Sequence, residues 1–300
     1  MKLKAKRPNI NLLGLAMGLL LAGATCARAE VTVQKDVSYL GEARAEKADI
    51  YTPSGKHKEL MPAVLVIHGG GWKSGDKADH RGVSISTDLA GQGYVVFAIN
   101  YMLASPDGTK PEDRKGGFPQ DVYDCKTALR YMRAHAKELG IDPKRIGILG
   151  ESAGGHLVVL LGATGHSGDM NQNGLYLDQS NDVTCVVDMY GIPNLDDPSI
   201  HYIRGPFKGA TEKETDANVK RANPWNYIDK TMPPTLILHG TADTTVPIEQ
   251  SIALDAKLTA LGVPHEFVKV PEGHHSFDLH PKEMDVRPVV FAFLKKYLQP

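Results

Sequence analysis

Short apolar runs alternate with amphipathic stretches along most of the chain. Six of the runs are apolar at consecutive positions, a pattern typical of parallel strands that are covered on both faces. These runs are residues 63–68, 94–100, 145–149, 184–189, 235–239 and 266–270. The pattern therefore predicts six buried strands of one sheet.

Helical periodicity fills the intervals between these strands. The clearest helix is predicted over residues 119–139, and Gly140 is the expected stop. Its apolar face is formed by Val122, Cys125, Leu129 and Met132. Further helices are predicted to start at Ser152, near Pro247 and near Pro281.

The alternation of strand and helix predicts an α/β fold, with a mostly parallel, twisted sheet of about eight strands and helices on both faces. Residues 31–39 and 43–51 predict an antiparallel hairpin at the start. Only residues 191–234 break the alternation, with weak helical periodicity at 211–221. Long irregular segments in compact domains are commonly functional. We expect residues 30–300 to form a single domain, with 191–234 as a lid or substrate-binding insertion.

The first 29 residues have the pattern of a secretory signal peptide, with basic residues, an apolar run at 12–24 and small residues before Ala29. That run of about 13 residues is shorter than the ~20 of a spanning helix, so we expect export to the periplasm or medium and no stable membrane anchor. The segment holds five of the 34 basic residues and none of the 35 acidic ones, which leaves a net charge of −6 on residues 30–300. An acidic chain without a basic tract argues against a nucleic-acid partner.

Two cysteines, Cys125 and Cys185, remain after residue 29, each within an apolar pattern. This placement favours two free core thiols over a disulfide. The chain has no CxxC and no HExxH motif, so the sequence predicts neither a metal site nor a cofactor.

Ser152 lies between Gly150 and Gly154 in a Gly-x-Ser-x-Gly pattern. Composition alone would produce such a match in roughly one chain in eight, so the context has to carry the interpretation. The strand at 145–149 and the apolar helical stretch at 156–161 supply the strand-turn-helix setting that the motif requires. We therefore expect Ser152 to be a nucleophile on a sharp turn, beside the positive end of a helix.

A serine nucleophile needs oxyanion donors and a base. The stretch His68-Gly69-Gly70-Gly71-Trp72 follows a predicted strand, and its glycine amides, with that of Ala153, can approach a substrate oxygen. A phosphate-binding loop would need a Lys-Ser/Thr ending or G-x-G-x-x-G spacing, and both are absent.

The candidate base and acid follow the last two predicted strands. His274 and His275 come after 266–270, and Asp243 comes after 235–239. The carboxyl ends of parallel strands meet at one edge of a sheet, where these side chains can approach Ser152. The order serine, acid, histidine is the order of an α/β-hydrolase.

Several stretches together resemble the bacterial esterase/lipase group of α/β-hydrolases, which includes hormone-sensitive-lipase-like carboxylesterases and feruloyl or acetyl xylan esterases. They are residues 68–72, 98–101, 140–146, 150–157 and 239–243. The resemblance implies Ser152 as nucleophile, Asp243 as acid and His275 as base, because the base of such enzymes commonly stands two residues before a Phe. It also implies oxyanion donation by the amides of Gly70, Gly71 and Ala153.

The resemblance further implies a serine esterase that hydrolyses short-chain or carbohydrate-linked acetyl or feruloyl esters through an acyl-enzyme. Met102 departs from the Arg usual in the group, and there is no room before the first strands for N-terminal cap helices. We therefore expect an open site and acyl chains of about four carbons or fewer. Two alternatives stay open: a serine peptidase of the prolyl oligopeptidase type, and a non-catalytic binding module on the same fold.

Overall fold

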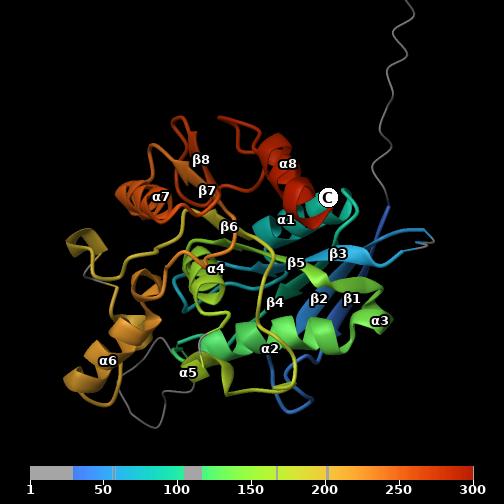
Figure 1. Ribbon diagram of the computed structural model, residues 1–300, viewed down its shortest axis with the longest axis horizontal. Helices are drawn as coiled ribbons and strands as arrows, with labels where there is room; N and C mark the ends of the chain where they lie inside the picture. The colour runs from blue at the N-terminus through green and yellow to red at the C-terminus, as the bar shows by residue number, and fades with distance from the viewer. Residues whose placement is uncertain are drawn as a thin grey trace, which may run out of the picture.

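The structure is a computed structural model that describes residues 30–299, except 56, 58, 105–116, 167, 201 and 202. Within these residues, eight strands form one sheet in the order β1-β2-β4-β3-β5-β6-β7-β8 (Figure 1). The strands are β1 (Val31–Val37), β2 (Ala48–Pro53), β3 (Met61–Ile67), β4 (Val95–Ile99), β5 (Ile141–Glu151), β6 (Val186–Met189), β7 (Thr235–Gly240) and β8 (His265–Val270). The predicted α/β class and strand number are confirmed.

The strand pairing matches the hydrophobic pattern. β2 pairs antiparallel with β1 and β4, and the other pairs are parallel. Every residue of β3, β4, β6 and β7 is buried, as consecutive apolar positions predict. The expectation of burial is wrong for β8, where only Val270 is buried. β8 lies at the edge of the sheet and has a neighbouring strand on one side only.

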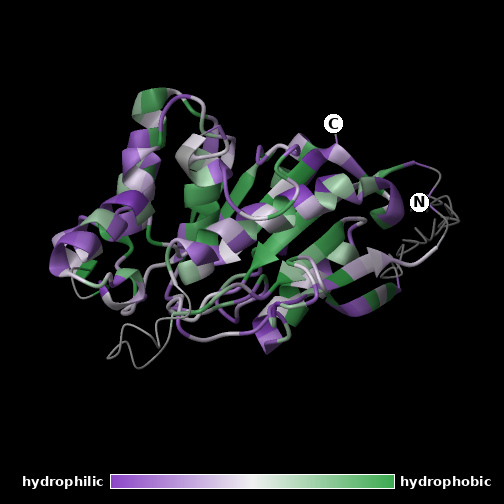
Figure 2. Cartoon of the chain, turned by 90° about the horizontal axis from the view of Figure 1, so that it is seen from below, coloured by the Kyte–Doolittle hydropathy of each residue, from purple (hydrophilic) through white to green (hydrophobic). Residues whose placement is uncertain are grey.

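Helices cover both faces of the sheet (Figure 1). One face packs against α1 (His80–Ala90) and α8 (Arg287–Leu298), and the other against α2 (Gln120–Ala134), α4 (Ala153–Ala163) and α7 (Glu249–Leu261). In Figure 2 the strands between these layers are largely hydrophobic, whereas the surrounding helices alternate between hydrophobic and hydrophilic residues. The hydrophobic patterning thus places the sheet in the core.

Two helix predictions need correction, and another helix was missed. The helix expected at 119–139 is divided into α2 and α3 (Ala136–Leu139) at His135, whose backbone is not helical. Gly140 ends α3 in the left-handed conformation, as expected. The last helix begins at Arg287, not near Pro281, and α1 has no counterpart among the sequence predictions.

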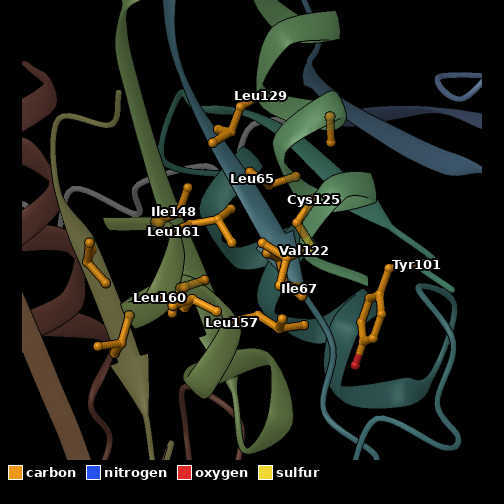
Figure 3. Packing of buried hydrophobic residues seen from close by; sticks show 14 of the residues in the cluster. Leu65, Ile67, Tyr101, Val122, Cys125, Leu129, Ile148, Leu157, Leu160 and Leu161 are labelled. Atoms are coloured by element: carbon orange, nitrogen blue, oxygen red, sulfur yellow. The ribbon is translucent and has the colours of Figure 1, made fainter. Parts of the chain in front are cut away.

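The apolar cluster between α2, α4 and the sheet holds the strand-to-helix turn at the end of β5 (Figure 3). Leu65 and Ile67 of β3 and Ile148 of β5 face Leu157 of α4 there, and all four are fully buried. Burying each such side chain contributes about 1.5–3 kcal/mol before conformational entropy is subtracted. The position of the turn between β5 and α4 is therefore fixed by core packing of the strand before it and the helix after it.

Cys125 and Cys185 are free and buried, as the sequence predicts. The proposed signal peptide at residues 1–29 lies outside the described residues. In the part of the chain that the structure does describe, no helix has the length and apolar character needed to cross a membrane.

The segment 191–234, expected to be an insertion, has among its described residues one α-helix, α6 (Glu212–Ala222), close to the weak periodicity noted at 211–221. Short 3-10 helices accompany it: η2 (Pro198–Ile200), η3 (Gly205–Phe207) and η4 (Pro224–Asn226). Thr211 caps α6 by accepting a hydrogen bond from the Glu214 amide.

Candidate active site

Ser152 occupies a strained turn between β5 and α4. Its backbone angles are φ 54° and ψ −115°, and a conformation of this kind costs on the order of 1–3 kcal/mol. A Cβ atom on Gly150 would lie 2.2 Å from the Gly154 carbonyl oxygen, and one on Gly154 would lie 2.1 Å from that of Ile67. Both motif glycines are therefore required by close backbone contacts.

Ser152, His275 and Asp243 form a continuous chain of hydrogen bonds. The Ser152 Oγ lies 2.9 Å from His275 Nε2, and His275 Nδ1 lies 2.7 Å from Asp243 Oδ2. The His275 side chain is 13% exposed and that of Asp243 is fully buried. The loops after β5, β7 and β8 thus bring together the three side chains that the sequence singles out.

Asp243 accepts hydrogen bonds at both carboxylate oxygens. Its Oδ1 accepts from the amides of Thr245 and Val246 at 2.8 and 2.9 Å, and its Oδ2 lies 3.2 Å from His239 Nε2. Burial acts to raise the pKa of Asp243, but the hydrogen bonds from His239, His275 and the Val246 amide outweigh it. The pKa is held well below its usual range, so the carboxylate stays charged beside His275.

His274, the other candidate base, makes no described hydrogen bond to Ser152, whose Oγ contacts His275 instead. His274 is exposed, and its Nδ1 lies 3.2 Å from the Ala242 carbonyl oxygen. His68 orders the glycine loop, because its Nδ1 lies 2.7 Å from the Gly69 carbonyl oxygen and its ring stacks on Tyr101. Burial lowers the pKa of His68, which keeps the ring neutral.

The glycine loop after β3 lies against the Ser152 turn. A Cβ atom on Gly69 would lie 3.1 Å from the Ser152 Cβ, and Gly70 and Gly71 have positive φ angles of 104° and 61°. Gly70, Gly71 and Ser152 line one cavity of about 520 Å³. Ala153 is buried as the first residue of α4, and the first amides of a helix have no partner within it.

Most of the other residues that line the cavity were not singled out by the sequence; Trp72 and His275 were. The insertion contributes Ile192, Ile203 and Pro206, which give one wall an apolar character. The remaining lining residues are Trp72, Lys73, Ser74, Arg81, Thr245, Val246, His275 and Ser276. Apart from Trp72 and His275, their side chains reach the cavity through tertiary contacts that no local pattern encodes.

A polar network lies behind the Ser152–His275 pair. Arg81 Nε donates to Glu151 Oε2 at 2.5 Å, and the Tyr190 hydroxyl lies 2.8 Å from the same oxygen and 2.5 Å from the Phe277 carbonyl oxygen. The Tyr190 ring also makes an edge contact with His275, with centroids 4.8 Å apart. Tyr190 follows β6 directly, so the strand-end argument that identified Asp243 applies to it as well.

His156 connects α4, the helix that follows Ser152, to residues 191–234. Its Nδ1 accepts from Trp72 Nε1 at 3.3 Å, and its Nε2 donates to the Ala222 carbonyl oxygen at 2.8 Å. Burial lowers the pKa of His156 to about 4, so the ring is neutral and both nitrogens are used. The Phe207 ring of η3 packs against Trp72 with centroids 5.3 Å apart. The insertion is thus docked on α4.

Metal ligation finds no support in residues 30–299 as described, which contain no group of three or more His, Cys, Asp or Glu side chains placed to hold a metal ion.

Residues 48–258 match the model of the family described as BD-FAE. Esterase LipC of Mycobacterium tuberculosis is 28% identical over 247 residues, which cover 80% of this chain and 59% of that protein. An acylamino-acid-releasing enzyme of Arabidopsis thaliana is 30% identical over 259 residues, which cover 81% of this chain and 32% of that protein. The chain therefore spans less than two thirds of the length of either relative.

A solved structure, the truncated form of a carbohydrate esterase from gut microbiota, superimposes on this chain with a TM-score of 0.74. The two are 27% identical, and the match covers 91% of this chain and 98% of the other. The sheet order, the Ser152 turn and this neighbour all indicate an α/β-hydrolase fold. Because the family match extends over more than half of its residues, the chain belongs to the BD-FAE family of α/β-hydrolases.

Proposed function

We propose that the chain is a serine carboxylesterase whose catalytic residues are Ser152, His275 and Asp243. The observation that carries this proposal is the hydrogen-bonded chain from Ser152 Oγ through His275 to Asp243, placed on a cavity at the ends of β5, β7 and β8. LipC and the carbohydrate esterase supply the substrate class, because both are named as esterases.

In the proposed mechanism, His275 Nε2 takes the proton of Ser152 as the Oγ attacks the ester carbonyl carbon. The negative carbonyl oxygen of the tetrahedral intermediate accepts hydrogen bonds from the amides of Gly70, Gly71 and Ala153, each worth about 3–4 kcal/mol. His275 then gives its proton to the departing alcohol. Water repeats the sequence on the acyl-enzyme and releases the acid.

The proposed substrates are short-chain esters, including acetyl or feruloyl groups on carbohydrates. A cavity of about 520 Å³ has to hold parts of both the acyl group and the alcohol, which favours acyl chains of about four carbons or fewer. Residues 191–234 would act as the substrate-binding insertion, since Ile192, Ile203 and Pro206 line the cavity. A clear optimum on long-chain p-nitrophenyl esters would refute this proposal.

Export to the periplasm or medium, with cleavage after Ala29, is the proposed location. It rests on the basic and apolar pattern of residues 1–29. The exported protein should begin at Glu30 when its N-terminus is sequenced. Recovery of the intact leader on cytoplasmic protein would contradict export.

The experiment for the catalytic assignment is Ser152→Ala, assayed on p-nitrophenyl acetate. We expect kcat to fall by at least about 10⁴-fold, the scale seen when a serine nucleophile is removed. A fluorophosphonate probe should label the native protein and Ser276→Ala, whose serine lines the same cavity, but not Ser152→Ala. Hydrolysis at the native rate by Ser152→Ala would overturn the mechanism, and a native protein that resists labelling would indicate a non-catalytic module.

A second candidate is peptide hydrolysis, favoured by the similarity to the acylamino-acid-releasing enzyme of Arabidopsis thaliana. The same three side chains can attack an amide, so their geometry does not separate the two activities. Comparison of N-acetylalanine p-nitroanilide with p-nitrophenyl acetate does separate them. We expect turnover of the ester only, and turnover of the anilide alone would reverse the assignment.

A further inference from the structure

Lys73 and Arg81 are the Lys or Arg side chains on the wall of the 520 Å³ cavity, and no Asp or Glu is among its described lining residues. This contrasts with residues 30–300 as a whole, whose net charge is −6. A cleft lined by one sign of charge concentrates ligands of the opposite sign.

Arg81 is held with its hydrogen-bonding fork partly unused. Its Nε donates to Glu151, whose side chain is 5% exposed, while the Arg81 side chain is 35% exposed. Among the described residues, the two terminal guanidinium nitrogens of Arg81 have no hydrogen-bond partner. A guanidinium presents five N–H donors in a plane, and two parallel donors match a carboxylate. Glu151 thus fixes Arg81 in place and leaves donors for a ligand.

Lys73 supplies positive charge that no described acidic residue neutralises by an ion pair. A Cβ atom on Gly205 would lie 3.0 Å from Lys73 Nζ, so the ammonium group lies beside η3 of the insertion. Since Arg81 is paired with Glu151, the net positive charge of the cavity comes mainly from Lys73. Arg81 would orient a bound anion through its planar donors, and Lys73 would attract the anion over a longer distance.

The position of Arg81 indicates that it lies beside the alcohol part of the substrate, not the acyl part. In the proposed mechanism His275 protonates the departing alcohol, so the alcohol lies on the His275 side of the cavity. Arg81, His275 and Ser276 line both this cavity and an adjacent one of about 400 Å³, whose wall also includes Lys282 and the acidic residues Asp278 and Glu283. An alcohol that extends from His275 into the adjacent cavity therefore passes Arg81.

We propose that the site takes esters whose alcohol carries a carboxylate, that is, O-acylated hydroxy acids such as acidic saccharides. Arg81 binds the carboxylate through its terminal nitrogens, and Lys73 attracts it into the cavity. This inference rests on the proposed esterase function and narrows its substrate class.

The test compares 4-acetoxybenzoate with its methyl ester, which differ in one negative charge on the alcohol side. The measured quantity is the ratio of kcat/KM for the anionic ester to that for the neutral ester, in native protein and variants. We expect Arg81→Gln and Lys73→Gln each to lower this ratio about threefold to fivefold, the range for partly exposed ion pairs. Comparing variants on the same two esters cancels their different intrinsic reactivities.

Three controls make the result specific. Lys295→Gln removes an exposed positive charge on α8 and should leave the ratio unchanged. Arg81→Lys keeps the positive charge but loses the paired guanidinium donors, so its ratio should lie between those of the native protein and Arg81→Gln. Raising the salt concentration should lower the ratio for the native protein, because the ions screen the attraction.

Arg81→Gln also removes a partner of Glu151, so its rate on the neutral ester is expected to fall; only the ratio tests the proposal. An unchanged ratio in both Arg81→Gln and Lys73→Gln would overturn it. The proposal would also be overturned if the native protein preferred p-nitrophenyl hemisuccinate, whose charge is on the acyl side, to 4-acetoxybenzoate. Failure of the proposed function looks different, since native protein would then hydrolyse neither acetoxybenzoate nor its methyl ester.

Discussion

Two buried aspartates lie at the carboxyl ends of neighbouring strands and differ in their ionisation. Asp188 is within β6 (Val186–Met189), and Asp243 lies three residues after β7 (Thr235–Gly240). Both side chains are fully buried. Burial raises the pKa of Asp188 to about 7, whereas the pKa of Asp243 is lowered.

The number of hydrogen-bond donors explains this difference. Asp188 Oδ1 accepts from the Gly191 amide at 2.9 Å, and its Oδ2 has no partner among the described residues. The field of His239 and the bond from Gly191 act to lower the pKa of Asp188, but burial dominates. Asp243 instead accepts from two amides and two histidines. Burial alone therefore does not make a carboxylate able to orient a histidine.

Asp188 is suited to a packing role. Its Oδ1 would lie 2.6 Å from a Cβ atom on Gly155 and 2.3 Å from one on Gly191. The carboxyl group thus fills the junction where the chain leaves β6 for the insertion, against the start of α4. An aspartate therefore packs the junction at the end of β6, whereas the aspartate after β7 has the proposed catalytic role.

The largest expected effect separates the two aspartates by activity. In Asp243→Asn, we expect kcat on p-nitrophenyl acetate to fall by about 10³–10⁴-fold, because an amide neither holds the tautomer of His275 nor stabilises its charged form. Asp188→Asn is the matched control, since it makes the same change at the neighbouring strand end, and it should keep kcat within about threefold. Equal losses in the two variants would remove the distinction between them.

The next effect separates the two aspartates by the pH dependence of stability. The pKa of Asp188 is about 7 in the folded chain and about 4 in an unfolded one, so the unfolded state loses its proton first as pH rises. The free energy of unfolding therefore decreases between pH 4 and 7, by up to about 4 kcal/mol from this group. The lowered pKa of Asp243 has the opposite sign, and its stabilisation is lost as pH falls below about 4.

Urea unfolding of native protein and Asp188→Asn at several pH values from 4.5 to 7.5 measures this slope. The variant should gain stability relative to the native protein as pH rises. Asp121, at the start of α2, is also buried with its pKa raised to about 7, but it is present in both proteins and cancels in the difference. A difference that does not change with pH would show that Asp188 is ionised at all these values.

The positions of Ser152, Asp243 and His275 were predictable because they depend on a motif and on strand ends. Gly150 and Gly154 report the close contacts of a sharp turn, and apolar runs locate the strands whose ends share an edge. Asp188 carries no such local signal. It lies inside an apolar run, and its lack of a second partner depends on the surrounding fold.

Other misses have comparable physical reasons. The buried positions of α1 include Gly82, Ser86 and Asp88, so this helix has no continuous apolar stripe for sequence periodicity to find. Arg81 was missed along with its helix. For α8, the informative signal was the proline in its first turn, Pro288, which suits a helix start better than Pro281 does.

The smallest expected effect concerns the other contribution of the β6 end, Tyr190. Its hydroxyl contacts Glu151 and the Phe277 carbonyl oxygen, two residues after His275, and its ring touches the His275 ring. Tyr190→Phe keeps the ring and removes the hydroxyl, which leaves the loop that carries His275 less restrained. We expect kcat on p-nitrophenyl acetate to fall about threefold to tenfold with little change in KM, the scale of one hydrogen bond.

Tyr39→Phe is the matched control for Tyr190→Phe. The Tyr39 hydroxyl is also buried and donates to a carbonyl oxygen, that of Asn100, at 2.6 Å, on the side of the sheet formed by β1 and β2. Both variants should lose about 1 kcal/mol of unfolding free energy, but only Tyr190→Phe should lose kcat. Equal kcat in the two would mean that the β6 end contributes to this site through packing alone, and that the difference between the strand ends rests entirely on Asp243.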